Sequence, residues 1–338
     1  MGVKIADIVE KKELSFDEVP RLVAVDAYNS IYQFLSSVRQ ADGTPLQDAQ
    51  GRVTSHLSGL FYRTCNLLGR GISPVYVFDG KPSDLKKKTL EQRAERKREA
   101  EEKLAAAREK GDLEGMRLYS QQTSRLTREM ADESKELLSL LGIPVVQALS
   151  EGEAQCAVMC ANGLVQAAAS QDYDSLLFGA PVLIKNLTIA GRRKLPRKNS
   201  FIDVLPERID LQPNLDALGI TRKKLVWIGI LAGTDFNAGI KGIGAKKALK
   251  LVRENDSFGG ILEKIGQEID YAPVEELFMN PPYTQTGREQ LRAKPPQREK
   301  LGEFMLSHSF SQDRIDSALK RAFADPAGSS QNTLEKFF

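Results

Sequence analysis

The sequence predicts an α/β protein built around a parallel sheet. Residues 22–25 and 74–78 are apolar without alternation, which is typical of strands buried on both faces. Helical patterns follow these runs, and an acidic residue stands directly after each of them. With 338 residues, the chain is long enough for one large α/β domain or for two smaller ones.

The first two predicted strands each end in an aspartate. Residues 22–25 lead directly to Asp26. After a helical stretch at residues 54–68, residues 74–78 lead to Asp79. Because the carboxyl ends of parallel strands meet at one edge of the sheet, we expect both aspartates at that edge.

Two further pairs of acids lie one βα unit apart. Glu151 and Glu153 follow a strand expected near residue 145, and Asp172 and Asp174 follow the apolar run at residues 167–169. Each pair alone has an ordinary explanation, since acids favour helix N-termini and aspartate is common in turns. Both pairs together, at this spacing, favour a site at the carboxyl edge of the sheet.

Six acids at one edge would repel one another strongly, so they require cations. Oxygen-only ligands select a hard ion, Mg²⁺ or Mn²⁺. Two such ions about 3.5–4 Å apart would activate a water and stabilise a leaving oxygen, as in phosphoryl-transfer sites. Asp235 is a seventh candidate acid, whereas His56 and His308 show no partner pattern that would indicate zinc or a histidine base.

The composition indicates an intracellular protein. The net charge is +3, no run of 18 apolar residues predicts a membrane span, and the N-terminus lacks the apolar segment of a signal peptide. The cysteines are Cys65, Cys156 and Cys160. Cys156 and Cys160, one helical turn apart, could bind a metal or cross-link, but reduced and buried cysteines are the expectation.

Residues 86–136 form a highly charged helical insertion with a break near residues 111–115. A helix that is polar all round is either solvated or wrapped about a charged ligand. Glu–Lys pairs would stabilise a plain solvated hairpin. The position of the insertion directly after Asp79 favours a basic gate over the metal site.

A glycine motif follows the apolar helix expected at residues 221–231. Gly242 and Gly244 precede Lys246 and Lys247. Such glycines let backbone N–H groups approach an anion at a helix N-terminus, although a tight helix–helix turn is the alternative. It is no Walker A loop, because GxxxxGK[ST] and a preceding strand are absent. A hairpin that grips a sugar-phosphate backbone fits better.

The remaining segments are less informative. Residues 181–184 predict a strand, and the basic turn at residues 192–198 faces solvent or contacts phosphate. Residues 270–300 are expected to be irregular and residues 298–323 helical. After the linker at residues 324–330, two terminal phenylalanines indicate an apolar plug for a partner's groove, with docking on the protein itself as the alternative.

In combination, these motifs resemble the flap endonucleases in their archaeal form, and the resemblance covers essentially the whole chain. Phe236 departs from the family pattern, which often has Tyr there; the change removes a hydroxyl but no ligand. The segments that carry the resemblance are Val25-Asp26-Ala27, Phe78-Asp79-Gly80-Lys81-Pro82, Glu151-Gly152-Glu153-Ala154, Gln171-Asp172-Tyr173-Asp174, Gly233-Thr234-Asp235 and Gly242-Ile243-Gly244.

The resemblance implies a 5′-nuclease (PIN-like) fold, with a mixed, mostly parallel central sheet flanked by helices. It implies a single nuclease domain over residues 1–324, with a helical arch at about 83–135. A helix–two-turn–helix motif would occupy about 221–255. Residues 325–338 would be a linker and a tail that binds the sliding clamp.

The resemblance also implies roles for individual residues. Lys86 and Arg93 match arch residues that reach the scissile phosphate and, with Asp79 and Asp172, are the implied catalytic residues. The implied metal site, direct or through water, is Asp26, Asp79, Glu151, Glu153, Asp172, Asp174 and Asp235. The implied DNA-binding residues are Gly2, Tyr32, Glu151, Gly233, Asp235, Gly242, Gly244, Lys246 and Lys247. The implied clamp-binding residues are Gln331, Leu334, Phe337 and Phe338.

The implied function is cleavage of DNA 5′ flaps at the junction of single strand and duplex, with 5′–3′ exonuclease activity, in Okazaki fragment maturation and base excision repair. Two Mg²⁺ ions, or Mn²⁺ in their place, would serve the site, and K⁺ would bind at the hairpin. The expected partners are flap, nicked or gapped DNA and a PCNA-type sliding clamp, with no membrane. We expect a monomer, in the cytoplasmic nucleoid of an archaeon.

Three alternatives stay open. The first is a junction or bubble endonuclease with the same core. The second is a clamp-bound DNA-binding scaffold without catalysis, against which the seven acids argue. The third is a small-molecule phosphohydrolase that uses Asp172 and Asp174, which leaves the arch, the hairpin and the tail unexplained.

Overall fold

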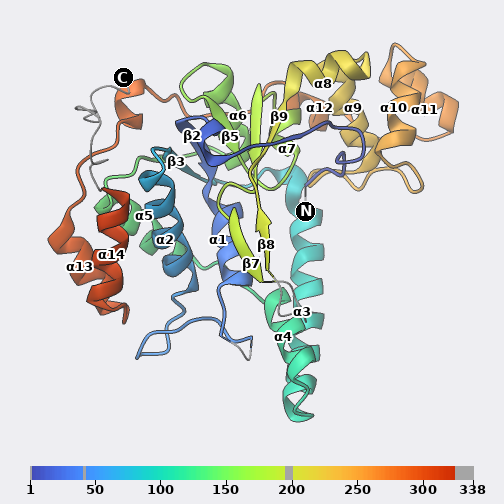
Figure 1. Ribbon diagram of the computed structural model, residues 1–338. Coiled ribbons are helices and arrows are strands. Elements are labelled where there is room, and N and C mark those ends of the chain that lie inside the picture. The colour runs from blue at the N-terminus through green and yellow to red at the C-terminus, as the bar shows by residue number, and fades with distance from the viewer. Residues whose placement is uncertain (1, 41–42, 195–200, 324–338) are drawn as a thin grey trace. The chain divides into compact units, whose positions relative to one another are not determined.

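The computed structural model describes residues 2–40, 43–194 and 201–323. Within these residues, seven strands form a sheet in the order β1-β9-β6-β5-β2-β3-β4, and β7 pairs with β8 in a separate ribbon (Figure 1). The strands are β1 (Lys12–Glu13), β2 (Leu22–Asp26), β3 (Ser73–Phe78), β4 (Val145–Gln147), β5 (Ala167–Ala169), β6 (Val182–Lys185), β7 (Gly191–Lys194), β8 (Phe201–Val204) and β9 (Glu207–Asp210).

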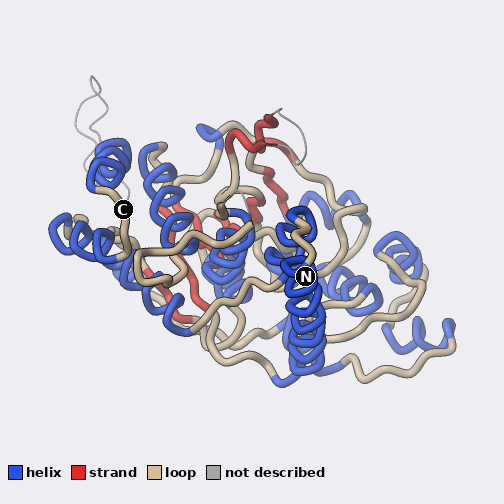
Figure 2. The backbone as a smooth tube through the Cα atoms, turned by 90° about the horizontal axis from the view of Figure 1, so that it is seen from below, coloured by secondary structure: helices blue, strands red, loops and turns tan. Residues whose placement is uncertain are grey.

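Helices make up most of the other described elements (Figure 2). They are α1 (Ala27–Ser37), α2 (Ser55–Gly69), α3 (Lys87–Glu109), α4 (Leu113–Gln122), α5 (Arg128–Leu140), α6 (Gly152–Ala161), α7 (Asp174–Leu177), α8 (Leu211–Leu218), α9 (Arg222–Ala232), α10 (Ala245–Arg253), α11 (Phe258–Ile265), α12 (Ala272–Met279), α13 (Arg298–Ser307) and α14 (Gln312–Ala322). This α/β architecture confirms the predicted fold class.

The sheet is mixed. Strand β5 runs parallel to β2, with Val23 opposite Ala167, and parallel to β6, with Ala169 opposite Ile184. Strand β9 is antiparallel to both β6 and β1. The buried apolar residues of β2 and β3 explain the absence of alternation in their sequence, because both faces of these strands are covered.

The chain divides into two compact units. The first contains Met1–Asn29, Val77–Glu99 and Val146–Thr286. In it, α6 packs against β5 and β2, and α9 packs against α7, α10 and α12. The first unit carries every acid of the predicted metal site.

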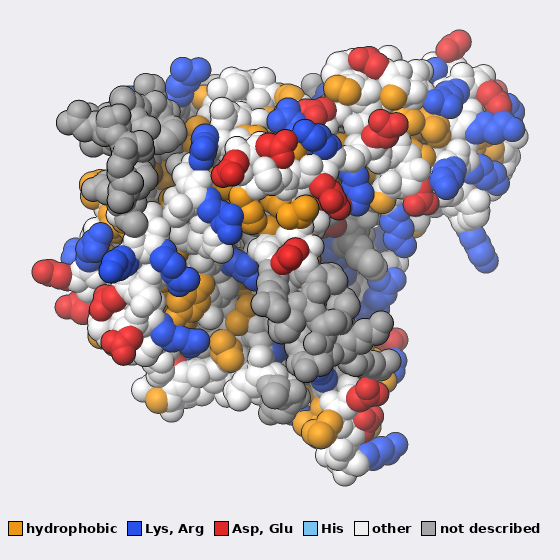
Figure 3. Space-filling model, in the orientation of Figure 1, with side chains coloured by type: hydrophobic (Ala, Val, Ile, Leu, Met, Phe, Trp, Pro, Cys, Tyr) orange, Lys and Arg blue, Asp and Glu red, His pale blue; other side chains and the backbone are white. Residues whose placement is uncertain are grey.

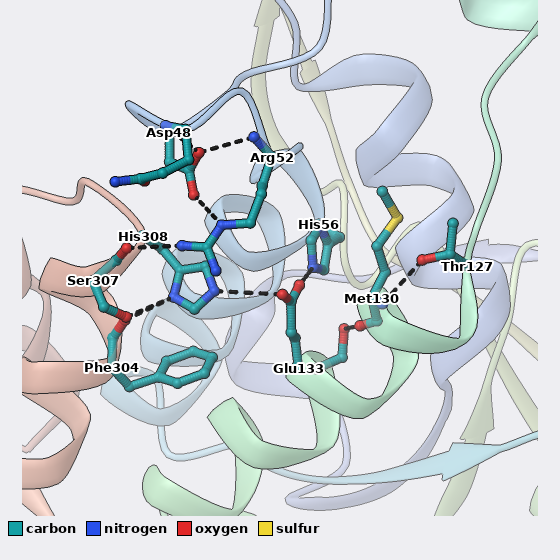
Figure 4. A network of polar contacts seen from close by, with 11 residues as sticks. Asp48, Arg52, His56, Thr127, Met130, Glu133, Phe304, Ser307 and His308 are labelled. Carbon is teal, nitrogen blue, oxygen red and sulfur yellow. Dashed lines mark hydrogen bonds and ion pairs between the residues drawn. The ribbon is translucent and has the colours of Figure 1, made fainter.

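The second unit contains Ser30–Tyr76, Ala100–Val145 and the chain from Gly287. In it, α2 packs against α5 and α14, and α13 packs against α5 and α14. A polar network joins α2, α5 and the end of α13, with Glu133 between His56 and His308 (Figure 4). The predicted single nuclease domain stays a prediction.

Several expectations about elements were wrong. Residues 270–300 are not irregular throughout, since α12 occupies Ala272–Met279 and buries Val274 and Phe278, one helical turn apart. The prediction of a basic turn at residues 192–198 is wrong for residues 192–194, because Gly191–Lys194 is strand β7.

Two helical stretches contain breaks that were not predicted. Helix α4 ends at Gln122 and α5 begins after Thr127, whose side chain accepts a hydrogen bond from the Met130 N–H at 3.2 Å. The stretch 298–323 is two helices, separated at Ser309, whose φ is 62°. The break expected near residues 111–115 is confirmed between α3 and α4.

The three cysteines are buried and free, as expected. Burial raises the pKa of the Cys65 thiol to about 12 and raises the pKa of the Cys156 thiol well above its usual range. Neither thiol therefore offers a thiolate at neutral pH.

Candidate active site

The first pair of strand-end acids lies where the apolar strands predicted it. Asp26 is the last residue of β2, and Asp79 directly follows β3, its neighbour in the sheet. Asp26 is 5 % exposed, so its carboxyl group lies almost entirely away from bulk water. The Gly152 N–H, at the start of α6, donates to Asp79 Oδ1 at 2.7 Å.

Glu151 and Glu153 reach the same region from the start of α6. Glu151 is the residue before the helix, and Glu153 stands in its first turn. The Ser170 hydroxyl donates to Glu153 Oε1 at 2.6 Å and thereby ties this helix to the loop after β5. The two glutamates are thus placed by a helix N-terminus, which favours acids.

Asp172 lies in the loop after β5, and Asp174 is the first residue of α7. The N–H of Gly2 donates to Asp172 Oδ1 at 3.1 Å, and the N–H of Val3 donates to Asp174 Oδ1 at 2.6 Å. A Cβ atom on Gly2 would lie 2.8 Å from the Asp172 Cβ atom, which is too close for any larger residue without a shift. The N-terminal segment therefore lies directly against both aspartates.

Two cations from the charged insertion enter this acid cluster. Lys86 donates to Glu151 Oε2, and its Nζ atom lies 3.8 Å from Asp235 Oδ2. Arg93 of α3 donates to Asp235 Oδ1 at 2.7 Å. Asp235 and Glu151 thus meet the implied arch residues directly.

The electrostatics of the cluster follow from buried like charges. Burial, and then repulsion from Asp79, raises the pKa of Asp26 well above its usual range. Burial is also the main reason that the pKa of Asp79 rises to about 6 and that of Asp174 to about 7. The pKa of Glu153 rises through burial and repulsion from Asp174, Asp172 and Asp26.

Lys86 responds in the opposite direction. Burial alone lowers the pKa of an ammonium group, but the Glu151, Asp79 and Asp235 carboxylates outweigh it and raise the pKa of Lys86 to about 12. The lysine therefore stays charged across the physiological range and neutralises part of the cluster.

The donor set suits a hard divalent cation. It consists of carboxylate oxygens, which Mg²⁺ and Mn²⁺ prefer. Glu151 Oε1 is buried and, among the described residues, has no hydrogen-bond partner. The described ranges 2–40, 43–194 and 201–323 contain no group of three or more acids, histidines or cysteines already arranged as a coordination shell. Several carboxylate oxygens are instead engaged by Lys86, Arg93 and backbone N–H groups.

The glycine hairpin joins α9 to α10. Gly233 has a φ of 96°, and Gly242 has a φ of 82°, a conformation that L-residues with a Cβ rarely adopt. No atom lies within 4 Å of a Cβ built on Gly242 or Gly244, so the backbone there is open to a ligand. Lys246 and Lys247 are exposed in the first turns of α10.

Two predicted sites fall outside the first unit or outside the described residues. Tyr32 belongs to α1 in the second unit and is 47 % exposed. Gln331, Leu334, Phe337 and Phe338 fall outside the described residues.

The sequence interpretation missed three residues that fix the loop after β5. The amide of Asn29 donates to Asp172 Oδ2 at 3.0 Å, and Ser170 bonds Glu153. Lys185, at the end of β6, donates to the Gln171 carbonyl oxygen at 2.6 Å. A charged residue that ends an apolar strand was the available signal for Lys185, because the same signal identified Asp26.

Known proteins share this arrangement of elements and motifs. The XPG N-terminal domain matches residues 3–100, and the XPG I-region matches residues 142–235. Flap endonuclease 1 of Pyrococcus furiosus is 50 % identical over 341 residues, which cover 100 % of this chain and 99 % of that protein. The chain belongs to the flap endonuclease family.

Other flap endonucleases agree with this membership. Flap endonuclease 1 of Archaeoglobus fulgidus is 47 % identical over 341 residues, which cover 100 % of this chain and 100 % of that protein. The solved flap endonuclease-1 from Methanococcus jannaschii matches with a TM-score of 0.73 and 38 % identity, over 95 % of this chain and 98 % of that one. The flap endonuclease resemblance drawn from the motifs is therefore confirmed.

Two more distant solved structures share the fold. The catalytic core of Rad2, solved with a DNA substrate, matches with a TM-score of 0.67 and 27 % identity, over 94 % of this chain and 98 % of that one. Human GEN1, solved with Holliday junction DNA, has a TM-score of 0.67 at 20 % identity, over 95 % of this chain and 77 % of that one.

Proposed function

We propose that this protein is a DNA nuclease that cuts 5′ flaps where the single strand joins the duplex, and that it also degrades DNA in the 5′–3′ direction. Full-length similarity to archaeal proteins named flap endonuclease 1 supports this proposal. The reaction is hydrolysis of one phosphodiester, which leaves a 5′-phosphate and a 3′-hydroxyl. Okazaki fragment maturation and base excision repair are the processes that need it.

The observation that carries the proposal is the meeting of the acid cluster with the basic insertion. Lys86 contacts Glu151 and Asp235, and Arg93 contacts Asp235, within one compact unit. A site that held only metal ions would not need these cations. A site that cuts a phosphodiester does, because negative charge builds on the phosphate oxygens in the transition state.

The carboxylates of this chain would hold two Mg²⁺ ions, with Mn²⁺ as a substitute. When bound, such ions supply activation of water and neutralisation of charge on the phosphate. The described residues that would hold them are Asp26, Asp79, Glu151, Glu153, Asp172, Asp174 and Asp235.

The cations have a different task. Lys86 and Arg93 would leave their carboxylate partners when a phosphate and the metal ions arrive, and would then bind the scissile phosphate. Their donors would stabilise charge that develops on its oxygens. Because Lys86 keeps a high pKa, it would act as a fixed positive charge and not as a proton donor.

The hairpin between α9 and α10 would hold the duplex. Exposed Lys246 and Lys247 would contact phosphates, and the open backbone at Gly242 and Gly244 would accept the sugar-phosphate chain, with K⁺ as a bound ion. Such contacts carry no base information, so specificity would come from the shape of the junction. Tyr32 would stack on a base beside the cut.

The C-terminal residues Gln331, Leu334, Phe337 and Phe338 would bind a PCNA-type sliding clamp. Aromatic anchors after a Gly/Ser-containing linker are typical of a tail that fills a partner's groove. We propose that the nuclease alone is monomeric and that it acts in the cytoplasmic nucleoid of an archaeon. No helix among the described residues is long and apolar enough to cross a membrane.

The alternatives are weaker. A junction endonuclease shares the fold, but the relatives that match over the full chain at 45–50 % identity are named flap endonucleases. A scaffold without catalysis would not need buried carboxylates that repel one another. A small-molecule phosphohydrolase would not need the glycine hairpin between α9 and α10.

The test compares the wild-type protein with Asp172→Asn on a labelled 5′-flap duplex with Mg²⁺. The wild type should cut once near the junction and stop when a chelator is added. Asp172→Asn should lose turnover and still bind flap DNA, because it removes a metal ligand and not a phosphate contact. Near-normal turnover of Asp172→Asn would remove this residue from the metal site, and a wild type that binds but never cuts would favour the scaffold.

A further inference from the structure

Lys185 is a buried lysine that the proposed chemistry does not use. It ends β6 and is 9 % exposed. Burial of an ammonium group is costly unless hydrogen bonds and opposite charges compensate for it. Its surroundings therefore show what it does.

The ammonium group holds the segment that carries Asp172 and Asp174. Strands β5 and β6 are parallel, with Ala169 opposite Ile184, so Lys185 comes level with the start of this segment. The Nζ atom donates to the Gln171 carbonyl oxygen at 2.6 Å and lies 3.5 Å from the centre of the Tyr173 ring. The residues before and between the two aspartates are thus both held by one side chain.

The backbone N–H of Gln171 is also held. It donates to Asn29 Oδ1 at 3.3 Å, while the Asn29 amide donates to Asp172 Oδ2. Gln171 is therefore fixed by Asn29 through its N–H and by Lys185 through its carbonyl. Rotation of this residue would move the Asp172 carboxylate out of its place.

Several charges surround Lys185. Its cross-strand neighbour Glu207 is paired with Lys11 at 2.7 Å. Asp172, Glu207 and Glu153 attract the Lys185 ammonium group, whereas Lys11 repels it. Among the described contacts, Lys185 forms no ion pair with the predicted metal-site acids.

We propose that Lys185 is a positioning residue for DNA hydrolysis, which acts by holding Gln171 and Tyr173 so that Asp172 and Asp174 together can bind a divalent cation. This inference rests on the proposed function. Residues that orient metal ligands typically change metal affinity or activity 10–100-fold when they are replaced.

Lys185→Met separates positioning from a plain charge effect. It keeps the length of the side chain and removes the ammonium group. A lysine that acted only as a nearby positive charge would weaken cation binding, so its removal would strengthen binding. A positioning lysine has the opposite effect, so its removal weakens binding.

The experiment measures Mn²⁺ binding to the full chain by calorimetry without DNA, and single-turnover flap cleavage against Mg²⁺ concentration. Lys185→Met should bind Mn²⁺ about 10-fold more weakly or worse and cleave about 10-fold more slowly or worse. Its affinity for flap DNA with Ca²⁺ should stay within about 2-fold of the wild type. Lys185→Arg should recover most of both losses, because a guanidinium also donates to a carbonyl and stacks on a ring.

Lys12→Met is the matched control. It removes an exposed lysine of the same sheet that pairs with Glu18 at 3.2 Å and does not hold the aspartate segment. It should behave as the wild type in both assays. Tighter Mn²⁺ binding by Lys185→Met, or binding and rate equal to those of Lys12→Met, would overturn the proposal.

Tyr173 gives a second comparison if Lys185→Met does not fold. Tyr173→Leu removes the ring under the ammonium group, and Tyr173→Phe keeps one. The leucine variant should bind Mn²⁺ more weakly than the phenylalanine variant, and equal binding would contradict the inference. A wild-type protein that binds Mn²⁺ but cuts no flap would contradict the proposed function. The role of Lys185 would then be decided by Mn²⁺ binding of the variants compared with the wild type.

Discussion

At the scale of single residues, the pairing of arch cations with site acids is the most informative feature. Lys86 pairs with Glu151, and Arg93 pairs with Asp235. Such pairs neutralise part of the negative charge of these carboxylates. They also place the cations within reach of any phosphate that takes their partners' place.

This arrangement predicts the kinetics of Lys86→Ala and Arg93→Ala. Each should lower the single-turnover cleavage rate about 100-fold, because each removes a donor that acts mainly in the transition state. The affinity for flap DNA should change by less than about 3-fold. Single-turnover rates and binding isotherms provide the measurement.

Lys88→Ala is the control for this pair of variants. Lys88 is exposed and lies two residues from Lys86 in the same charged segment. It should keep a rate within about 2-fold of the wild type. A loss of affinity alone in Lys86→Ala or Arg93→Ala would remove these residues from the transition state.

The contacts of Glu133 predict how the stability of the fold depends on pH. His56 Nε2 lies 2.9 Å from one oxygen of Glu133, and His308 Nε2 lies 3.5 Å from the other (Figure 4). The hydrogen bond with His56, helped by the charges of both histidines, lowers the pKa of Glu133 below its ordinary 4.5. His308 Nδ1 donates to the Phe304 carbonyl oxygen at 2.8 Å, so its other nitrogen faces the glutamate.

A lowered carboxyl pKa stabilises the fold at high pH and not at low pH. The contribution is complete above the unfolded pKa of about 4.5 and is lost as the pH falls through the folded value. Glu133→Gln should therefore lower the free energy of unfolding by about 1–3 kcal/mol at pH 7. The difference from the wild type should shrink below pH 4.

Thermal unfolding followed by circular dichroism from pH 3 to pH 8 measures this effect. Glu136→Gln is the matched control, because Glu136 is exposed on the same helix. A destabilisation that is equal at pH 3 and pH 7 would show that the charge of Glu133 contributes nothing.

The sequence predicted the acids of the proposed site but not the residues that hold them. Asp26 and Asp79 were predictable, since an apolar strand followed by an acid is a local pattern. Asn29 and Ser170 were not, because their roles depend on contacts with residues 143 and 17 positions away. The position of Lys185 at the end of an apolar strand was a signal, but its partner, the Gln171 backbone carbonyl, cannot be read from the sequence.

At the scale of elements, strands were predicted well where both faces are buried. Strands β2, β3 and β5 match the apolar runs closely. Strands β1, β7, β8 and β9 were missed. Charged or partly exposed residues make up most of β1, β7 and β9, and pairing with a neighbour decides the conformation of such strands. Helix α12 was missed since the surrounding prolines outweighed its two buried side chains, Val274 and Phe278.

The exposed lysines at the start of helix α10 predict a contribution to DNA affinity. Its buried face carries Ala245, Ala248 and Val252, while Lys246 and Lys247 are exposed at its start. Figure 3 shows lysine and arginine side chains gathered over the α10–α11 end of the first unit. An N-terminus that also carries exposed lysines is suited to phosphate contacts.

The double variant Lys246→Ala/Lys247→Ala should weaken flap binding uniformly across sequences. The slope of log affinity against log salt should fall by about 2, one for each lost phosphate contact. At saturating DNA, the cleavage rate should stay within about 3-fold of the wild type. Affinities measured from 50 to 200 mM salt test this.

Lys264→Ala serves as the control for the hairpin. Lys264 belongs to α11 and pairs with Glu254 at 2.8 Å, so it is already neutralised by a neighbour. Its replacement should leave the salt slope nearly unchanged. An unchanged slope in the double variant would remove the α10 lysines from the DNA-binding surface.

At the scale of the whole molecule, the predicted functional residues are distributed unequally between the two compact units. All seven predicted metal-site acids, both arch cations and the glycine hairpin belong to the first unit. The second unit contributes Tyr32 and a core of α2, α5, α13 and α14. The sequence predicted the α/β class, but not this division, because the units interleave along the chain.

We propose that this chain cuts a threaded 5′ flap with metal ions held by its acids. The most direct test is cleavage of a labelled 5′-flap duplex with Mg²⁺, beside the same flap blocked at its 5′ end by a bulky adduct. We predict one cut near the junction that is lost with a chelator and suppressed by the block. Cleavage that ignores the block would contradict threading through the arch, and tight binding without any cleavage would contradict the nuclease itself.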